Sequence, residues 1–245
     1  MVRVVWGAVI FLAVIGIEIS AGRSLVLAFP TQFGRLVAVE EQLENWMMTF
    51  FSAQFDGNYA HARELDAHFT KHRTLTLVHI VPGFLFMVLG PFQFIRRIRS
   101  RRIWVHRLIG RVFVASGLVI GLSALVMSFR MPMTGANETA ALALFALIFL
   151  FDLGKAFWHI RRREIAQHRE WMIRAFAIGL AVATIRPIVG LFFATSGLTH
   201  LTFREFFGTA CWIGFTLHLI AAEIWVNYTR PKVAALPEGL RQEIS

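Results

Sequence analysis

Long apolar runs alternate with short polar links along most of the chain. Each run is about 20 residues long, which is the length that an α-helix needs to cross the hydrocarbon core of a bilayer. Lipid offers no hydrogen-bond partner to exposed backbone, and the runs are too long for barrel strands, so each run is predicted to be a helix. The pattern therefore predicts an all-α fold, a polytopic membrane helix bundle of about six transmembrane helices. The predicted spans are Val4–Ala28, Leu75–Ile95, Leu108–Phe129, Thr139–Ile160, Trp171–Ala194 and Phe206–Tyr228.

The longest stretch between these runs, residues 30–74, separates the first two spans. Apolar residues recur at helical spacing between Leu36 and Phe51, opposite Glu40, Glu41 and Glu44, as in an amphipathic helix. An acidic polar face suits packing on the protein better than binding anionic lipid, so we expect a helical extracytoplasmic lid. The predicted parts are a first transmembrane helix (1–29), this segment (30–74), a five-helix membrane core with two basic cytoplasmic hairpins (75–228) and a cytoplasmic tail (229–245).

The first run has two interpretations. A basic start, an apolar stretch and small residues from Ser20 to Gly22 are also features of a cleaved signal peptide. Apolar residues continue from Leu25 to Phe29, directly before Pro30. This continuation favours a retained anchor, and N-terminal sequencing of the mature protein distinguishes the two.

Charge sets the expected orientation of the spans. The chain is 56% hydrophobic and only 16% charged, and much of its net charge of +10 lies in two links. Residues 96–111 carry seven arginines and no acid, and residues 155–174 carry six basic residues against two acidic ones. Under the positive-inside rule both links face the cytoplasm, and an even number of spans places both termini there. We expect a multi-pass inner-membrane protein whose basic rim contacts anionic lipid, and no nucleic-acid binding.

The two basic hairpins resemble each other. The sequence RRIWVHRLIGRVFV surrounds His106, and REIAQHREWMIRAFA surrounds His168. Each has a basic linker, a His-Arg pair, and an arginine five or six residues later, Arg111 or Arg174. If an axis along the membrane normal relates the hairpins, the two histidines lie at equal depth.

Three ordered motifs also resemble a known family. They are GPFQF from Gly90, the arginine-rich linker into HRLIGR from His106, and HREWMIRAFAIGLAVATIRP from His168 to Pro187. Together they resemble a family of bacterial predicted membrane proteins, the domain-of-unknown-function family twenty-three-oh-six. The resemblance implies a multi-span inner-membrane protein and carries no established activity or cofactor.

Ionisable residues within spans are candidates for function because each is costly in hydrocarbon. Two histidines on facing helices can clamp a b-type haem, as in the cytochrome b561 class. His106 and His168 would be the inner ligands, with Arg107 and Arg169 beside the propionates. His79 and His218 are further candidate ligands. The alternative is that the His-Arg pairs are surface groups that contact linker carbonyls and lipid phosphates.

A second hypothesis is transport, or binding of lipid or another small molecule. Glu18, His79 and Arg186 would line an outward cavity, where Pro82 and Pro187 interrupt the helical hydrogen bonding. The alternative is a proline kink with an ion pair that holds the bundle. A third hypothesis is a non-catalytic subunit with a membrane-protein partner or a second copy of the chain. Further candidates for ligand contacts or ion pairs are Arg111, Asp152, Arg174 and Glu223.

A stripe of histidines runs through His61, His68, His72 and His79. The predicted topology divides it, because only His79 enters the membrane. His68 and His72, with Glu64 as a third ligand, form a candidate metal site, although a solvated or lid-packed pair is the favoured interpretation. The single cysteine, Cys211, excludes a disulfide framework and a thiolate metal cage. Of the three hypotheses, the sequence favours a haem-binding or redox-linked membrane protein, and it leaves open whether the chain is an enzyme.

Overall fold

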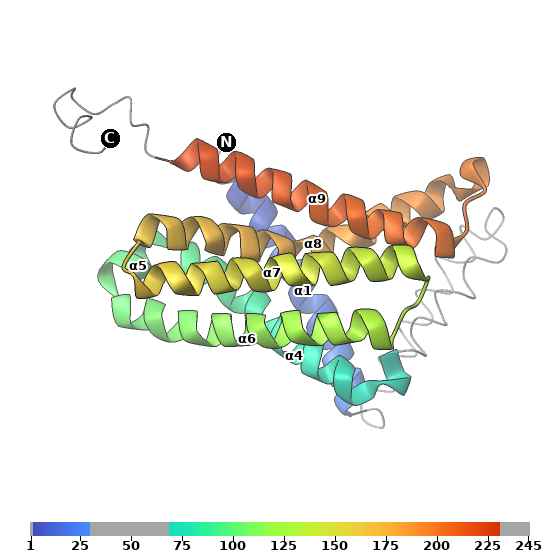
Figure 1. Cartoon of the computed structure of the whole chain (residues 1–245), viewed down its shortest axis with the longest axis horizontal. Helices are drawn as coiled ribbons and strands as arrows, with labels where there is room; N and C mark the ends of the chain where they lie inside the picture. The colour runs from blue at the N-terminus through green and yellow to red at the C-terminus, as the bar shows by residue number, and fades with distance from the viewer. Residues whose placement is uncertain (1, 30–68, 231–245) are drawn as a thin grey trace.

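The computed structural model of the protein describes residues 2–29 and 69–230, and these ranges contain helices and no β-strand (Figure 1). Six of the helices are long and apolar enough to cross a membrane, so the predicted all-α membrane bundle is confirmed. The predicted lid, apart from its last residues, and nearly all of the predicted tail lie outside the described residues. The helices are α1 (Val2–Ala28), α4 (Arg73–Phe94), α5 (Arg96–Arg101), α6 (Ile103–Arg130), α7 (Ala136–Arg161), α8 (Ile165–Thr199) and α9 (Phe203–Thr229).

Several helices extend beyond the predicted apolar runs. α6 begins at Ile103 rather than Leu108, and α8 begins at Ile165 rather than Trp171. The basic link before α6 itself contains the short helix α5. Hydropathy finds the part of a helix that lies in hydrocarbon, whereas Arg, Gln and Glu continue a helix readily into the polar region. As a result His106 and His168 lie in the first turns of helices.

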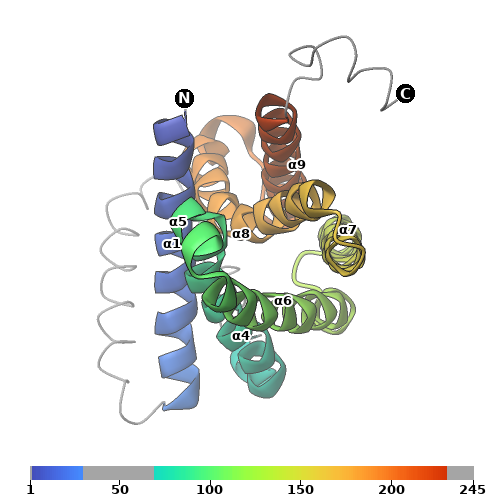
Figure 2. The same cartoon turned by 90° about the vertical axis from the view of Figure 1, so that its left-hand side faces the viewer.

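Four helices, α4, α6, α7 and α8, pack side by side at the centre of the bundle (Figure 2), and each contributes one phenylalanine to a common layer. The rings of Phe86 and Phe113 stack with centroids 4.1 Å apart, and Phe149 meets Phe86 edge to face at 5.6 Å. Phe176 lies 5.8 Å from Phe86 and 6.0 Å from Phe113. All four are at most 4% exposed, so this phenylalanine layer is part of the packed core.

Glycines make room for these rings. A Cβ atom added at Gly90 would lie 2.1 Å from the ring of Phe176, and one added at Gly179 would lie 2.5 Å from Phe86. Any larger residue would therefore displace a buried ring, because protein interiors are close-packed.

The two outer helices, α1 and α9, pack against this centre in different ways. α1 runs antiparallel to α4 along its whole length, from the edge contact of Trp6 with Phe94 to the hydrogen bond from Arg73 to the Ala28 carbonyl. α9 packs on α8 and α7. Both α1 and α4 cross the other helices obliquely (Figures 1 and 2). α1 therefore covers the same depth of the bundle as α4.

Candidate functional site

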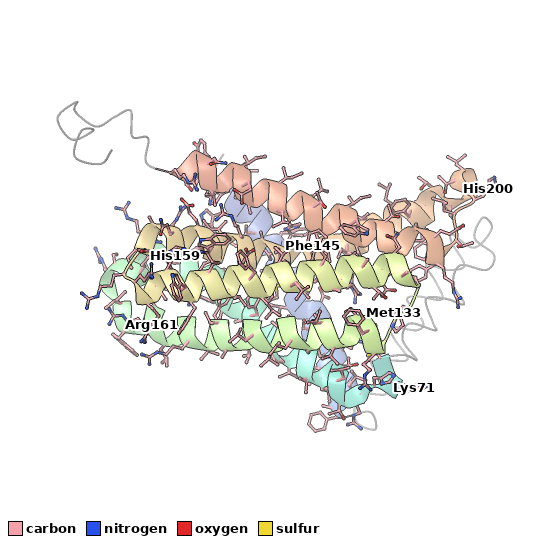
Figure 3. All side chains as sticks on the ribbon, viewed as in Figure 1. Lys71, Met133, Phe145, His159, Arg161 and His200 are labelled. Carbon is pink, nitrogen blue, oxygen red and sulfur yellow. The ribbon has the colours of Figure 1, made fainter. Side chains whose placement is uncertain are left out.

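One end of the bundle, here called the basic end, carries the arginines of α5 and of the turn between α7 and α8. Figure 3 shows Arg161 and His159 at this end and Lys71, Met133 and His200 at the opposite end. The first residues of α1 and the last residues of α9 also lie at the basic end, since Trp6 contacts Phe94 and Thr229 contacts Arg169. The predicted basic hairpins therefore gather on one side of the bundle.

A layer of polar groups lies between the phenylalanine layer and the basic end. Gln93 follows Phe86 by seven residues on α4, and Ala156 follows Phe149 by seven on α7. Each separation is two helical turns, or about 11 Å along the axis at about 1.5 Å per residue. His106 and His168 precede the phenylalanines of α6 and α8 by seven and eight residues. We call Gln93, His106, the Ala156 carbonyl and His168 the polar layer.

His168 is fixed within this layer. Its Nδ1 atom lies 2.8 Å from the carbonyl oxygen of Ala156. A carbonyl only accepts hydrogen bonds, so Nδ1 must carry the proton and donate. The tautomer of the neutral ring is thereby set, with Nε2 left as a free lone pair.

Two other atoms of the layer are buried without a partner in the described structure, Nδ1 of His106 and Nε2 of Gln93. The imidazole of His106 lies within electrostatic range of His168 and Arg99. A Cβ atom added at Gly110 would lie 3.2 Å from Oε1 of Gln93, so the amide fills the space beside that glycine. Buried polar atoms normally have hydrogen-bond partners, so these two atoms can form hydrogen bonds with a bound group.

Arginines surround the layer. Arg169 donates from Nη2 to the Thr229 hydroxyl at 2.9 Å and lies within electrostatic range of Arg99. The next charged contact outward is a bidentate pair in which Arg230 donates to Glu170 at 2.6 and 2.7 Å. The Glu170 carboxylate raises the pKa of Arg230 above its usual value. Arg107 is a further, exposed arginine. Together these arginines make the surroundings of the polar layer strongly cationic.

A second group of ionisable residues joins α7, α8 and α9, and we call it the α7–α9 cluster. Arg174 donates through Nε and Nη2 to the two carboxylate oxygens of Glu223. The guanidinium of Arg174 lies 4.7 Å from the ring centre of Trp171, and the ammonium of Lys155 lies 5.6 Å from it. Asp152 is 2% exposed and within electrostatic range of Arg174 and Glu223, and its Oδ2 has no partner in the described structure.

The remaining predicted residues are separate from both groups. Nδ1 of His79 lies 3.0 Å from the Ser123 hydroxyl, and Nε2 of His218 lies 2.7 Å from the Thr184 hydroxyl. These contacts hold each histidine to the neighbouring helix. α4 and α8 continue as helices through Pro82 and Pro187, and neither proline has a backbone N–H to donate to the preceding turn. The exposed predicted residues are Glu18, Arg111 and Arg186.

The predicted metal site lies mostly outside the described residues, because only His72 of the three candidates is described. Within the described ranges no group of three or more His, Cys, Asp or Glu side chains is arranged to hold a metal ion. The free cysteine, Cys211, is buried. The site of His68, His72 and Glu64 stays a prediction.

Sequence reasoning missed Gln93 and Trp171, which belong to these groups, and His159, which lies beside the polar layer. Gln93 was passed over because one amide in an apolar motif carries no signal by itself, although its seven-residue distance from Phe86 places it on the core face. Nδ1 of His159 donates to the Glu164 carboxylate at 2.5 Å, and the ring lies within electrostatic range of His168. Trp171, the first residue of a predicted span, carries no signal of a site by itself. Contacts between helices, which no single-helix pattern contains, bring these residues to the sites.

The polar layer has two features of a haem site. Two histidines approach from α6 and α8 at the same level, one with its tautomer fixed and one with an orphan nitrogen. Bis-histidine ligation in a helix bundle uses this arrangement. Two open hollows lie at the basic end, one lined by Arg96, Arg97, Ser100 and Arg101 and the other by Glu164 to Gln167. Neither hollow is lined by His106 or His168, and neither lies beside Arg186 or His79.

Comparison with known proteins gives one match. Residues 76–226, more than half of the chain, match the family described as "Predicted membrane protein (DUF2306)". No curated protein and no solved structure matches the chain. The matched range contains every residue of the polar layer and of the α7–α9 cluster.

Proposed function

The chain belongs to the DUF2306 family of predicted membrane proteins, and from this premise we propose that it is a redox-linked membrane protein that holds one b-type haem between His106 and His168. The observation that carries the proposal is the pairing of these two histidines in the polar layer. They come from non-adjacent helices of the four-helix centre and lie within electrostatic range of each other. Two facing imidazoles are the ligand set of a low-spin b-type haem.

Each residue of the polar layer has a role in this proposal. The hydrogen bond from Nδ1 to the Ala156 carbonyl orients His168 and leaves Nε2 to bind iron, as second-shell partners do at metal sites. His106 supplies the second imidazole. Bound haem would supply one-electron transfer, and the protein would set its potential through these ligands and their surroundings.

The cations around the layer suit the propionates of a haem. Arg99, Arg107 and Arg169 surround the two histidines at the basic end. Guanidinium groups bind carboxylates through charge-assisted hydrogen bonds. Nε2 of Gln93 is a further buried donor that has no acceptor in the described structure. A dianionic group is therefore favoured in this part of the bundle.

The charge distribution also supports a membrane orientation. We place the basic end in the cytoplasm of a bacterial cell, because arginine-rich links stay on the cytoplasmic side of the inner membrane. α1 begins and α9 ends at that end, so both termini would be cytoplasmic. The exposed arginines of α5 would contact anionic lipid at about 1 kcal/mol for each residue near the surface.

Absorption spectroscopy tests the proposal. The full chain is expressed with haem supplementation, purified in detergent and examined for a Soret band and for reduced α and β bands. Haem bound in a ratio near one per chain, and lost on replacement of either His106 or His168, supports the proposal. A colourless protein after haem-replete expression refutes it.

A further inference from the structure

α7 and α9 contact each other near the end opposite the basic end and diverge toward the basic end (Figure 1). Their contacts include the stacked rings of Phe145 and Phe215, with centroids 4.6 Å apart, and the bond from Nε1 of Trp212 to Asn137 at 3.0 Å. Toward the basic end α9 is held to α8 instead, through Arg174–Glu223 and Glu170–Arg230. α8 packs against both helices there, and the α7–α9 cluster joins the three helices through Asp152, Arg174 and Glu223.

Asp152 is the member of this cluster that has a buried oxygen atom without a hydrogen-bond donor. Asp152 is only 2% exposed, and its Oδ2 atom has no partner in the described structure. The nearest cations are already engaged, because Arg174 donates both of its contacts to Glu223, and Lys155 lies over Trp171. A buried carboxyl oxygen without a donor is costly. Such an oxygen suits a ligand that brings a donor.

The depth of Asp152 restricts the kind of ligand. It precedes Arg161, the end of α7, by nine residues, or about 14 Å along the helix. The phosphate of a phospholipid stays in the headgroup region, so it would not reach this level without a large distortion. A molecule that dissolves in the hydrocarbon with its polar head reaches it readily.

The charge of the cluster restricts the ligand further. Asp152 and Glu223 balance Lys155 and Arg174, so the four groups have no formal net charge. Neither an anionic nor a cationic head gains from such a set, whereas a neutral head with hydroxyl or carbonyl groups does. A carboxyl group can accept from a hydroxyl when ionised and donate to a carbonyl when protonated. The flat ring of Trp171, which is half-buried beside the cluster, offers a surface for an aromatic head.

We propose that the α7–α9 cluster binds the head of a lipid-soluble quinone or quinol, with Asp152 as its hydrogen-bonding partner. The inference rests on the proposed redox function, because Asp152 lies one helical turn from Ala156, whose carbonyl holds His168. A ligand here would sit beside the polar layer. Entry would be lateral, from the lipid, past the half-exposed carboxylate of Glu223.

Binding is measured directly on the purified full chain, without any redox assay. Decyl-benzoquinone and its hydroquinone are titrated by equilibrium dialysis in detergent, and the dissociation constant is compared among wild type, Asp152→Leu and Gln167→Leu. The leucine at 152 removes every hydrogen bond and keeps the branched shape of the side chain, whereas Gln167 is an exposed residue of α8 and serves as the polar-to-leucine control. We expect binding to weaken about tenfold or more for Asp152→Leu and to stay unchanged for Gln167→Leu.

A photoactivatable quinone adds a test that does not depend on a variant that folds. Labelled peptides are expected from α7, α8 and α9 around residues 151–155, 171–174 and 220–224. Equal binding by Asp152→Leu, labelling confined to other helices, or displacement of the probe by phosphatidylethanolamine at equal concentration would overturn the inference. The outcome is separable from the haem test. A haem-free chain that binds the quinone through Asp152 supports the quinone site and refutes the haem proposal. A haem-loaded chain that does not bind the quinone supports the haem proposal and refutes the quinone site.

Discussion

The Nδ1 atom of His168 on α8 donates a hydrogen bond of 2.8 Å to the carbonyl oxygen of Ala156 on α7. Its counterpart in the polar layer, Nδ1 of His106, is buried without a partner in the described structure. The two imidazoles therefore contribute differently to the protein without cofactor. One stabilises the bundle, and the other costs it stability.

Replacement of each histidine in the haem-free protein tests this difference. His106→Leu removes a buried orphan atom and is expected to raise the free energy of unfolding by about 1 kcal/mol. His168→Leu removes the bond to Ala156 and is expected to lower it by a similar amount. Thermal unfolding in detergent measures both. Equal effects of the same sign would contradict the assignment of one bonded and one orphan imidazole.

Glycine replacement tests the phenylalanine layer. Gly90→Ala and Gly179→Ala would place a Cβ atom 2.1 and 2.5 Å from buried rings, so each is expected to destabilise the protein by about 1–3 kcal/mol. Gly154→Ala and Gly190→Ala are matched controls, because a Cβ atom at either meets nothing within 4 Å. The controls are expected to be neutral or slightly stabilising, since alanine favours helix. Thermal shifts that are similar for all four variants would show that the layer is packed differently.

The Arg174–Glu223 pair is open to a double-mutant cycle. The side chains are 14% and 48% exposed, so the cost of Arg174→Met alone should fall between the roughly 0–1 kcal/mol of exposed pairs and the roughly 3–5 kcal/mol of buried ones. The double variant Arg174→Met with Glu223→Leu leaves no unpaired charge and should recover most of that loss. A double variant as unstable as the sum of the two single variants would mean that the residues do not interact.

Cysteine labelling tests the proposed orientation. The native Cys211 is 1% exposed and should not react. Ser100→Cys at the basic end and Thr199→Cys at the other end are both exposed positions. In intact cells an impermeant maleimide is expected to label only Thr199→Cys from the periplasm, after outer-membrane permeabilisation, and Ser100→Cys only after the inner membrane is opened. The reverse pattern would place the basic end outside the cytoplasm.

The number of long helices and their rough positions were predictable, because span length is set by the thickness of a membrane and each apolar run exceeds it. The ends of the helices were not. The polar residues before Leu108 and Trp171 extend α6 and α8, and they place His106 and His168 inside helices rather than in links. Hydropathy cannot detect this extension, because polar residues outside hydrocarbon form helix as well as loop.

The candidate sites were predictable in part for a related reason. The repeated His-Arg pattern predicted equal depth for His106 and His168, and the structure brings the two within electrostatic range. Intramembrane charge alone identified Asp152, Arg174 and Glu223, yet their assembly across α7, α8 and α9 depends on helix packing. Gln93 was missed because its place in the polar layer depends on neighbours from other helices, such as Gly110 on α6, and no local spacing records them.

The central claim is that His106 and His168 together hold one haem, and the measurement that tests it most directly is haem stoichiometry across matched variants. Pyridine haemochrome analysis is applied to wild type, His106→Leu, His168→Leu and the control His200→Asn, all expressed with haem supplementation. His200 is exposed at the end of α8 in a left-handed conformation that asparagine tolerates. The account predicts about one haem per chain in wild type and control, and none in either leucine variant. No haem in the wild type, or full haem in both leucine variants, would contradict it.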